Sequence, residues 1–161
     1  MKPTLIILGM TAAIGLLSGA AAAASSGSKS TLTLEAAKRA ASMAKTQAHT
    51  KGSTIAISVV DDGGHLIYLE RDDGAAYGMV DASLLKAQTA ASFGFPTKAL
   101  EDQIKQGHAG YLKLPGALPL EGGIPIVAHG VLIGAIGVAG GDSPDDGVAA
   151  KTGAAAISTD Q

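Results

Sequence analysis

The sequence contains no cysteine and no tryptophan, and its only aromatic residues are three tyrosines and two phenylalanines. Without cysteine, the chain cannot form disulfides, Cys-ligated zinc sites or iron–sulfur clusters, and it offers no thiol nucleophile and no lipidation site for a lipoprotein. Hydrophobic residues still make up 47% of the 161 residues, so the core must come from Ile, Val, Leu and Ala. This length predicts one domain of ordinary size.

Charge and motifs exclude several classes of function. The formal net charge is −2 and the sequence has no basic stripe, which excludes a nucleic acid as partner. The sequence lacks paired metal-site histidines, a calcium loop, a phosphate loop, a dinucleotide fingerprint and a nucleophile elbow. Its acidic pairs coincide with turn signals. Residue chemistry alone therefore indicates an exported α/β binding domain without an evident catalytic apparatus.

The N-terminal segment has the three parts of a secretory signal peptide. Lys2 precedes an apolar run over residues 4–17, and small residues with several A-x-A sites follow. A transmembrane anchor is the alternative, but no basic stop-transfer cluster follows the run. We therefore predict a signal peptide over residues 1–24, a flexible mature N-terminus over 25–30 and a single domain over 31–161. The mature protein is expected to be periplasmic or secreted, with no membrane attachment after cleavage.

Periodicity predicts helices and hairpins in alternation. Apolar spacing and turn residues predict helices over 31–51, 79–93, 97–107 and 143–157, strands over 54–61 and 65–71, an ordered loop with at most one short strand over 108–120, and a hairpin over 122–141. Since hairpins dominate, the sheet should be mainly antiparallel. Both faces of the last hairpin are apolar, so helices should cover both faces, or another subunit should cover one.

The hairpin over 122–141 is the segment around which the chain is organised. Its turn falls at His129-Gly130, and its entrance is the Gly122-Gly123-Ile124-Pro125 turn, whose exposed N–H groups could cradle a ligand. Four histidines, at positions 49, 65, 108 and 129, are the available metal ligands or acid–base groups. For each of them a structural role is favoured. Arg71 shares a strand face with His65, but six residues separate them by roughly 20 Å.

Several motifs together resemble a known family. They are LTLEAAKRA, ISVVDDGGHLIYLERDDGA, LLKAQTAASFGFPT, LPGALPLEGGIPIVAHGVLIGAIGVAGG and SPDDGVAAKTG. Their order and spacing over residues 32–157 are similar to the GlcG/HbpS-type domain, which also forms the C-terminal domain of PduO-type proteins. The resemblance implies an α/β (α+β) fold, a profilin-like or PAS-like three-layer α-β-α domain with a roughly five-stranded, mainly antiparallel sheet. It also implies symmetric homo-oligomers, from dimers to octamers.

The resemblance further implies a small-molecule ligand, most often haem or another tetrapyrrole. Haem needs an axial ligand and cations for its propionates. The axial candidates are His65, His49 and His129, and the cationic candidates are Arg71 and Lys86. Thr89 matches a threonine that the family links with haem binding, and Gly122, Gly123 and Pro125 match the family's pocket-edge loop. No E-x-x-E pair is present, which argues against a surface iron site of the HbpS kind.

Two other functions remain open. The domain could be an enzyme or accessory protein acting on a small carboxylate such as a 2-hydroxy acid, held by Arg71 or Lys86. It could also be a structural oligomer with a vestigial pocket. The one enzymatic activity that the resemblance implies, besides ligand binding, is haem degradation.

Overall fold

The computed structural model describes residues 31–158, so the predicted signal peptide and the predicted flexible segment over 25–30 lie outside the described residues. The elements in chain order are α1 (Leu34–His49), β1 (Ala56–Asp61), β2 (Leu66–Arg71), α2 (Gly78–Phe93), α3 (Lys98–Lys105), the 3₁₀ helix η1 (Ala109–Lys113), β3 (Gly123–Ala128), β4 (Val131–Ala139) and α4 (Ser143–Ser158). Within this part of the chain, no helix has the length and hydropathy needed to span a membrane.

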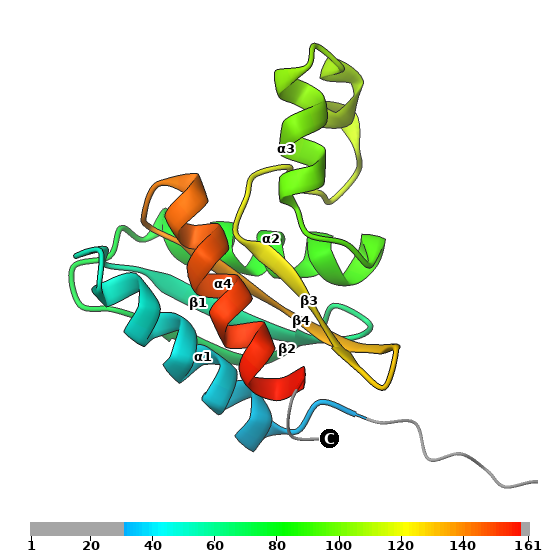
Figure 1. The fold of residues 1–161 in the computed structure, drawn as a ribbon. Helices are drawn as coiled ribbons and strands as arrows, with labels where there is room; N and C mark the ends of the chain where they lie inside the picture. The colour runs from blue at the N-terminus through cyan, green and yellow to red at the C-terminus, as the bar shows by residue number, and fades with distance from the viewer. Residues whose placement is uncertain (1–30, 159–161) are drawn as a thin grey trace, which may run out of the picture.

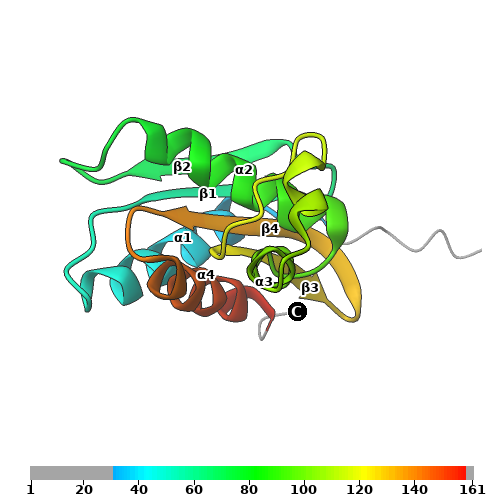
Figure 2. The ribbon, with the colours of Figure 1, turned by 90° about the horizontal axis from the view of Figure 1, so that it is seen from above.

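The elements form three layers around one antiparallel sheet (Figures 1 and 2). The strand order is β2-β1-β4-β3. Helices α1 and α4 pack side by side on one face, and α2 covers the other. This confirms the predicted α-β-α arrangement, with four strands instead of about five. The sequence prediction was wrong in allowing a strand over 108–120, because that segment contains η1 and an extended loop.

Small residues let α1 and α4 approach the sheet and each other closely. Thr33 caps α1, as its side chain accepts a hydrogen bond from the Ala36 N–H at 3.2 Å. A Cβ at Gly153 of α4 would lie 2.6 Å from the carbonyl oxygen of Ala40 in α1. The buried alanines of α1 are Ala36, Ala37, Ala40, Ala41, Ala44 and Ala48. They pack against the β-branched core of β1 and β4, which contains no aromatic residue.

On the opposite face of the sheet, glycine likewise allows a helix to approach closely. A Cβ at Gly137 of β4 would lie 2.6 Å from the Ala87 nitrogen of α2, so α2 packs directly on the strand backbone.

The turn between β3 and β4 falls at His129-Gly130, as predicted. Both residues have positive φ, 49° and 77°, as a two-residue type I′ hairpin turn requires.

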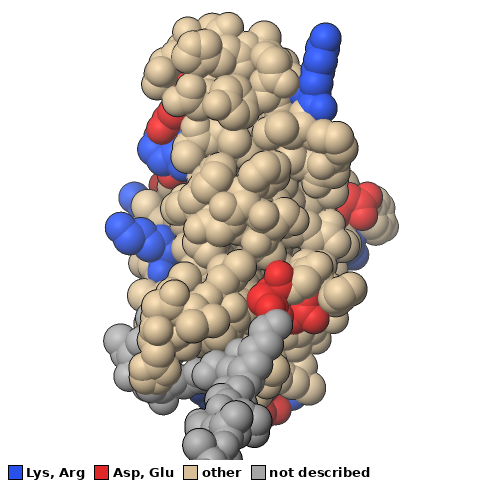
Figure 3. Space-filling model, turned by 90° about the vertical axis from the view of Figure 1, so that its right-hand side faces the viewer, with Lys and Arg blue, Asp and Glu red and all other residues tan. Residues whose placement is uncertain are grey.

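Four of the five aromatic side chains lie at the surface, whereas the fifth, Tyr68, is partly buried against the core. Tyr77, Phe93, Phe95 and Tyr111 are all exposed, and the rings of Phe93 and Phe95 contact each other at a centroid distance of 5.7 Å. Figure 3 shows one side of the molecule on which most of the surface comes from residues other than Lys, Arg, Asp and Glu, with most charged residues near the margins and one acidic group below the centre.

Helix α3 and η1 project from one end of the sheet (Figure 1). We call residues 95–121 the arm. Thr97 stands at the N-cap position of α3, but its side chain makes no capping hydrogen bond. Its hydroxyl instead holds the two ends of the arm together, as described below.

Candidate functional site

The structure brings three of the predicted site features together at the base of the arm. They are Lys86 and Thr89 on α2 and the Gly122-Gly123 turn that leads into β3. A Cβ at Gly122 would lie 2.8 Å from the Lys86 amine, and a Cβ at Gly123 would overlap the Lys86 backbone, so only glycine fits this turn. Pro125, two residues further along, is partly buried within edge strand β3, where proline is tolerated.

The other predicted residues lie elsewhere. His129 is at the tip of the β3–β4 hairpin, six residues and roughly 20 Å along the strand from Gly123. His65 lies in the β1–β2 turn at that same end of the sheet, where its Nδ1 is 3.3 Å from Asp61. Arg71 ends β2, the edge strand opposite β3, and its guanidinium stacks 4.6 Å from the ring centroid of Tyr77.

His49 belongs to a polar cluster at the end of α1. Its Nε2 lies 2.7 Å from the buried carboxylate of Asp72, which also accepts the Ile55 N–H and pairs with Lys45 at 3.0 Å. Burial opposes ionisation of Asp72, but these hydrogen bonds outweigh it and lower the pKa of the carboxyl. Lys45 also pairs with Glu70 at 2.6 Å. The cluster therefore fastens α1 to the edge of the sheet.

Lys86 forms a buried clamp between the two helical layers. Its amine donates to the Val138 carbonyl and to Asp146 of α4, both at 2.9 Å. Asp146 also accepts the Gly141 N–H. Burial raises the pKa of the Asp146 carboxyl, although the charge of Lys86 acts in the opposite direction. Both side chains are 4% exposed, so this pair joins α2 to α4 across the end of the sheet.

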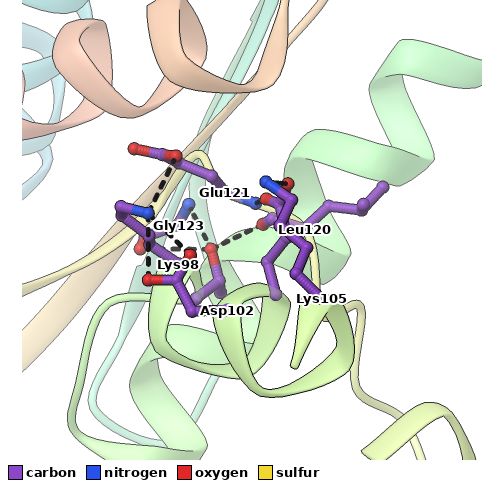
Figure 4. A network of polar contacts seen from close by, with 8 residues as sticks. Lys98, Asp102, Lys105, Leu120, Glu121 and Gly123 are labelled. Atoms are coloured by element: carbon purple, nitrogen blue, oxygen red, sulfur yellow. Dashed lines mark hydrogen bonds and ion pairs between the residues drawn. The ribbon is translucent and has the colours of Figure 1, made fainter. Parts of the chain in front are cut away.

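Two threonines attach the arm to the body. The Thr97 hydroxyl donates to the Leu120 carbonyl at 2.6 Å and accepts the Gly123 N–H at 2.9 Å. The Thr89 hydroxyl accepts the Leu118 N–H at 2.8 Å. Figure 4 shows how the contacts of Leu120 and Gly123 and the neighbouring ion pairs gather where the arm returns to β3. The predicted pocket-edge turn thus anchors the arm.

A cavity of about 400 Å³ opens on the arm itself. Its lining residues are Gln103, His108, Gly110, Tyr111 and Leu114. The Nδ1 of His108 lies 2.8 Å from the Gln103 side-chain oxygen. Since that oxygen can only accept, this contact favours the neutral tautomer in which Nδ1 donates and Nε2 keeps its lone pair. Three further cavities lie on the surface, and none of the four is lined by His49, His65, His129 or Lys86.

His108 was weighed from the sequence but not chosen as a ligand. It follows the C-terminus of α3, and Gly107 with a φ of 96° turns the chain back toward Gln103. A glutamine five residues before a histidine across a helix end is the one signal that could have indicated this pair. Among residues 31–158, no group of three or more metal-ligating side chains is arranged to hold a metal ion.

Comparison with known proteins now identifies the family. The family model described as haem degrading protein HbpS-like matches residues 32–155. The chain belongs to the HbpS-like family. Protein GlcG of Escherichia coli K12 is 39% identical over 92 residues, which cover 57% of this chain and 69% of GlcG. An uncharacterized 15.0 kDa protein from the dhaT-dhaS intergenic region of Citrobacter freundii is 35% identical over 126 residues, covering 76% and 89% of the two chains.

Solved HbpS-like structures confirm the fold. The crystal structure of a double mutant of HbpS from Streptomyces reticuli superposes with a TM-score of 0.73 at 35% identity, covering 94% of this chain and 99% of HbpS. The structure of a PduOC:heme complex gives a TM-score of 0.71 at 25% identity, covering 80% and 96%. These matches confirm the resemblance found in the sequence. Haem-related binding is thus a property supported for the family.

Proposed function

We propose that this protein binds haem, or a related tetrapyrrole, in the arm cavity with His108 as the axial ligand. The observation that carries the proposal is the hydrogen bond between His108 Nδ1 and Gln103, which leaves Nε2 available on a residue that lines a cavity. A histidine that ligates a metal commonly donates its other ring N–H to a neighbouring oxygen, which fixes the tautomer and raises its basicity.

The cavity suits a flat apolar ligand in other respects. Its volume lies within the usual range for ligand sites, and Tyr111 and Leu114 offer aromatic and aliphatic contacts for a macrocycle face. Lys113 follows on the same 3₁₀ helix, is exposed and has no ion-pair partner in the described part of the chain, so it is available to a propionate. Bound haem would supply a redox-active iron, while these residues would hold and orient it.

The three histidines named as axial candidates from the sequence are less suited than His108 to ligate haem iron. His49 and His65 each hold a carboxylate through one ring nitrogen. For His49 that nitrogen is Nε2, so only Nδ1, the ring nitrogen beside the backbone, would remain for a metal. His129 stands on an exposed hairpin tip. We therefore place His108 first and keep the other three as comparisons.

The proposal is tested by titrating hemin into the purified chain and following the Soret band. We expect saturable binding of one hemin per chain. His108→Ala should weaken binding at least about tenfold, and Gln103→Ala should weaken it by about tenfold through loss of the oriented tautomer. His65→Ala and His129→Ala are matched controls and should bind like the wild type. Wild-type affinity in His108→Ala would refute the assignment.

We also propose that the protein is exported and works as a homo-oligomer. The proposed export depends on residues 1–24, and the oligomer is supported by the exposed aromatic side chains and the largely uncharged face in Figure 3. Light scattering on the mature chain should give the mass of a dimer or larger assembly. A monomer at micromolar concentration would contradict this part of the proposal.

A further inference from the structure

A different cavity of about 400 Å³ lies between α4 and the base of the arm. It shares no lining residue with the His108 cavity. Its walls combine apolar side chains with charges of both signs. The lining residues are Pro96, Lys98, Glu121, Ile124, Gly147, Val148 and Lys151.

Glu121 presents a carboxylate that is mostly buried and accepts no hydrogen bond from any residue in the range 31–158. Its side chain is 16% exposed, and its nearest cation, the amine of Lys98, is 3.9 Å away, beyond hydrogen-bond distance. That amine already donates to both oxygens of Asp102, at 2.7 and 2.9 Å. Figure 4 shows the Glu121 side chain extending away from the arm toward α4. Among the described residues no side-chain oxygen is fully buried without a partner, so this carboxylate stays accessible to water or to a ligand in the cavity.

Gly147 makes the space that this carboxylate occupies. It lies inside α4, where glycine lowers helix stability, and its φ is not in the left-handed region. A Cβ at this position would lie 2.6 Å from Glu121 Cγ and 2.8 Å from Cδ. The glycine is therefore explained by the placement of the Glu121 side chain against the helix.

Lys151 supplies the opposite charge on the same wall. It lies one helical turn after Gly147, lines the same cavity and has no ion-pair partner within residues 31–158. With Lys98 neutralised by Asp102, the cavity retains one anion and one cation. Ile124 and Val148 add apolar surface to the same walls.

We propose that this cavity binds a small zwitterion of the aminoalkanoate class. The ligand's ammonium donates to Glu121, its carboxylate accepts from Lys151, and its methylene groups contact Ile124 and Val148. Each charged group of the ligand thereby gains a charge-assisted hydrogen bond, and a ligand with one charge gains only one of them. This site is independent of haem binding in the arm cavity.

The test uses the full purified chain without haem and records ¹⁵N–¹H spectra during titration with 5-aminopentanoate. We expect saturable shifts of the Gly147, Glu121 and Ile124 amides. Pentylamine and pentanoate, which each carry one charge, should bind at least about tenfold more weakly, because each loses one charge-assisted contact. Saturation that is equal for the three compounds, or no saturable shift of these amides, would overturn the proposal.

Variants identify the residues responsible. Glu121→Gln and Lys151→Met should each weaken 5-aminopentanoate binding about fivefold or more, whereas Lys51→Met, an exposed lysine at the end of α1, should bind like the wild type. Gly147→Ala should keep the fold, shown by circular dichroism, but displace the Glu121 carboxylate and abolish saturation. Wild-type affinity in Glu121→Gln would refute the site even if Gly147→Ala did not fold.

Discussion

The buried pair Lys86–Asp146 gives the sharpest prediction about stability. Replacing Lys86 by Met keeps the length and apolar stem of the side chain but leaves the Asp146 carboxylate buried without its cation. Removing one partner of a buried ion pair costs about 3–5 kcal/mol, against a total stability of about 5–15 kcal/mol for an ordinary domain. We therefore expect Lys86→Met to lower the melting temperature by roughly 10–20 °C.

Urea unfolding followed by circular dichroism measures this cost directly. The matched control is Lys98→Met, which breaks a pair with Asp102 whose side chains are 50% and 41% exposed, against 4% each for Lys86 and Asp146. An exposed pair contributes at most about 1 kcal/mol. The double variant Lys86→Met/Asp146→Leu should lose less unfolding free energy than the two single variants lose together, because no unpaired charge stays buried.

The pH dependence of Lys86→Met provides a second check. Burial already raises the pKa of Asp146, and loss of the Lys86 charge raises it further. When the folded pKa lies above the unfolded value, the folded state binds more protons, so stability falls as pH rises through that window. Acidification from neutral pH should therefore reduce the deficit of the variant relative to the wild type. A cost below about 1 kcal/mol, or a deficit that does not change with pH, would refute this reasoning.

Three further predictions concern other parts of the fold. Thr97→Val leaves the buried Gly123 N–H without an acceptor and should lower the free energy of urea unfolding by about 1–3 kcal/mol. Thr97→Ser keeps a hydroxyl at this position and should retain most of that stability. Hydrogen bonds keep the pKa of Asp72 low in the folded state, so Asp72→Asn should cost about 2 kcal/mol at neutral pH; this difference should vanish as pH falls through the folded pKa, and a deficit persisting in acid would contradict it. Gly137→Ala forces a Cβ onto the backbone of α2 and should cost about 3 kcal/mol or more, while the control Gly78→Ala, with open space around it, should be neutral or slightly stabilising.

Local patterns carried enough information to predict the elements but not every attachment between them. Apolar spacing and turn residues predicted α1, and the His129-Gly130 turn between two apolar runs predicted the last hairpin. Both depend on residues close in sequence. The Lys86–Asp146 clamp joins residues 60 positions apart, and no local pattern indicates such a partner. Lys86 was therefore predicted as a cation for a ligand, although the structure gives its amine two protein acceptors.

The same difference between local patterns and long-range contacts explains which parts of the candidate sites could be predicted. Thr89 and Gly122 were predicted from family motifs, and the structure places both at the base of the arm. The free nitrogen of His108 became apparent only once the loop after α3 returned to Gln103. Gly147 packs against Glu121, which lies 26 positions earlier in the sequence. Which side chains share a cavity is decided by tertiary packing, which periodicity does not report.

Direct observation of the iron–histidine bond tests the central claim that His108 is the axial ligand. Resonance Raman spectra of the reduced haem complex should show an iron–histidine stretching band in the wild type. The band should disappear in His108→Ala, shift in Gln103→Leu because the imidazole loses its hydrogen-bond acceptor, and stay unchanged in His65→Ala. A band that persists in His108→Ala, or that is absent from the wild-type complex, would contradict the account.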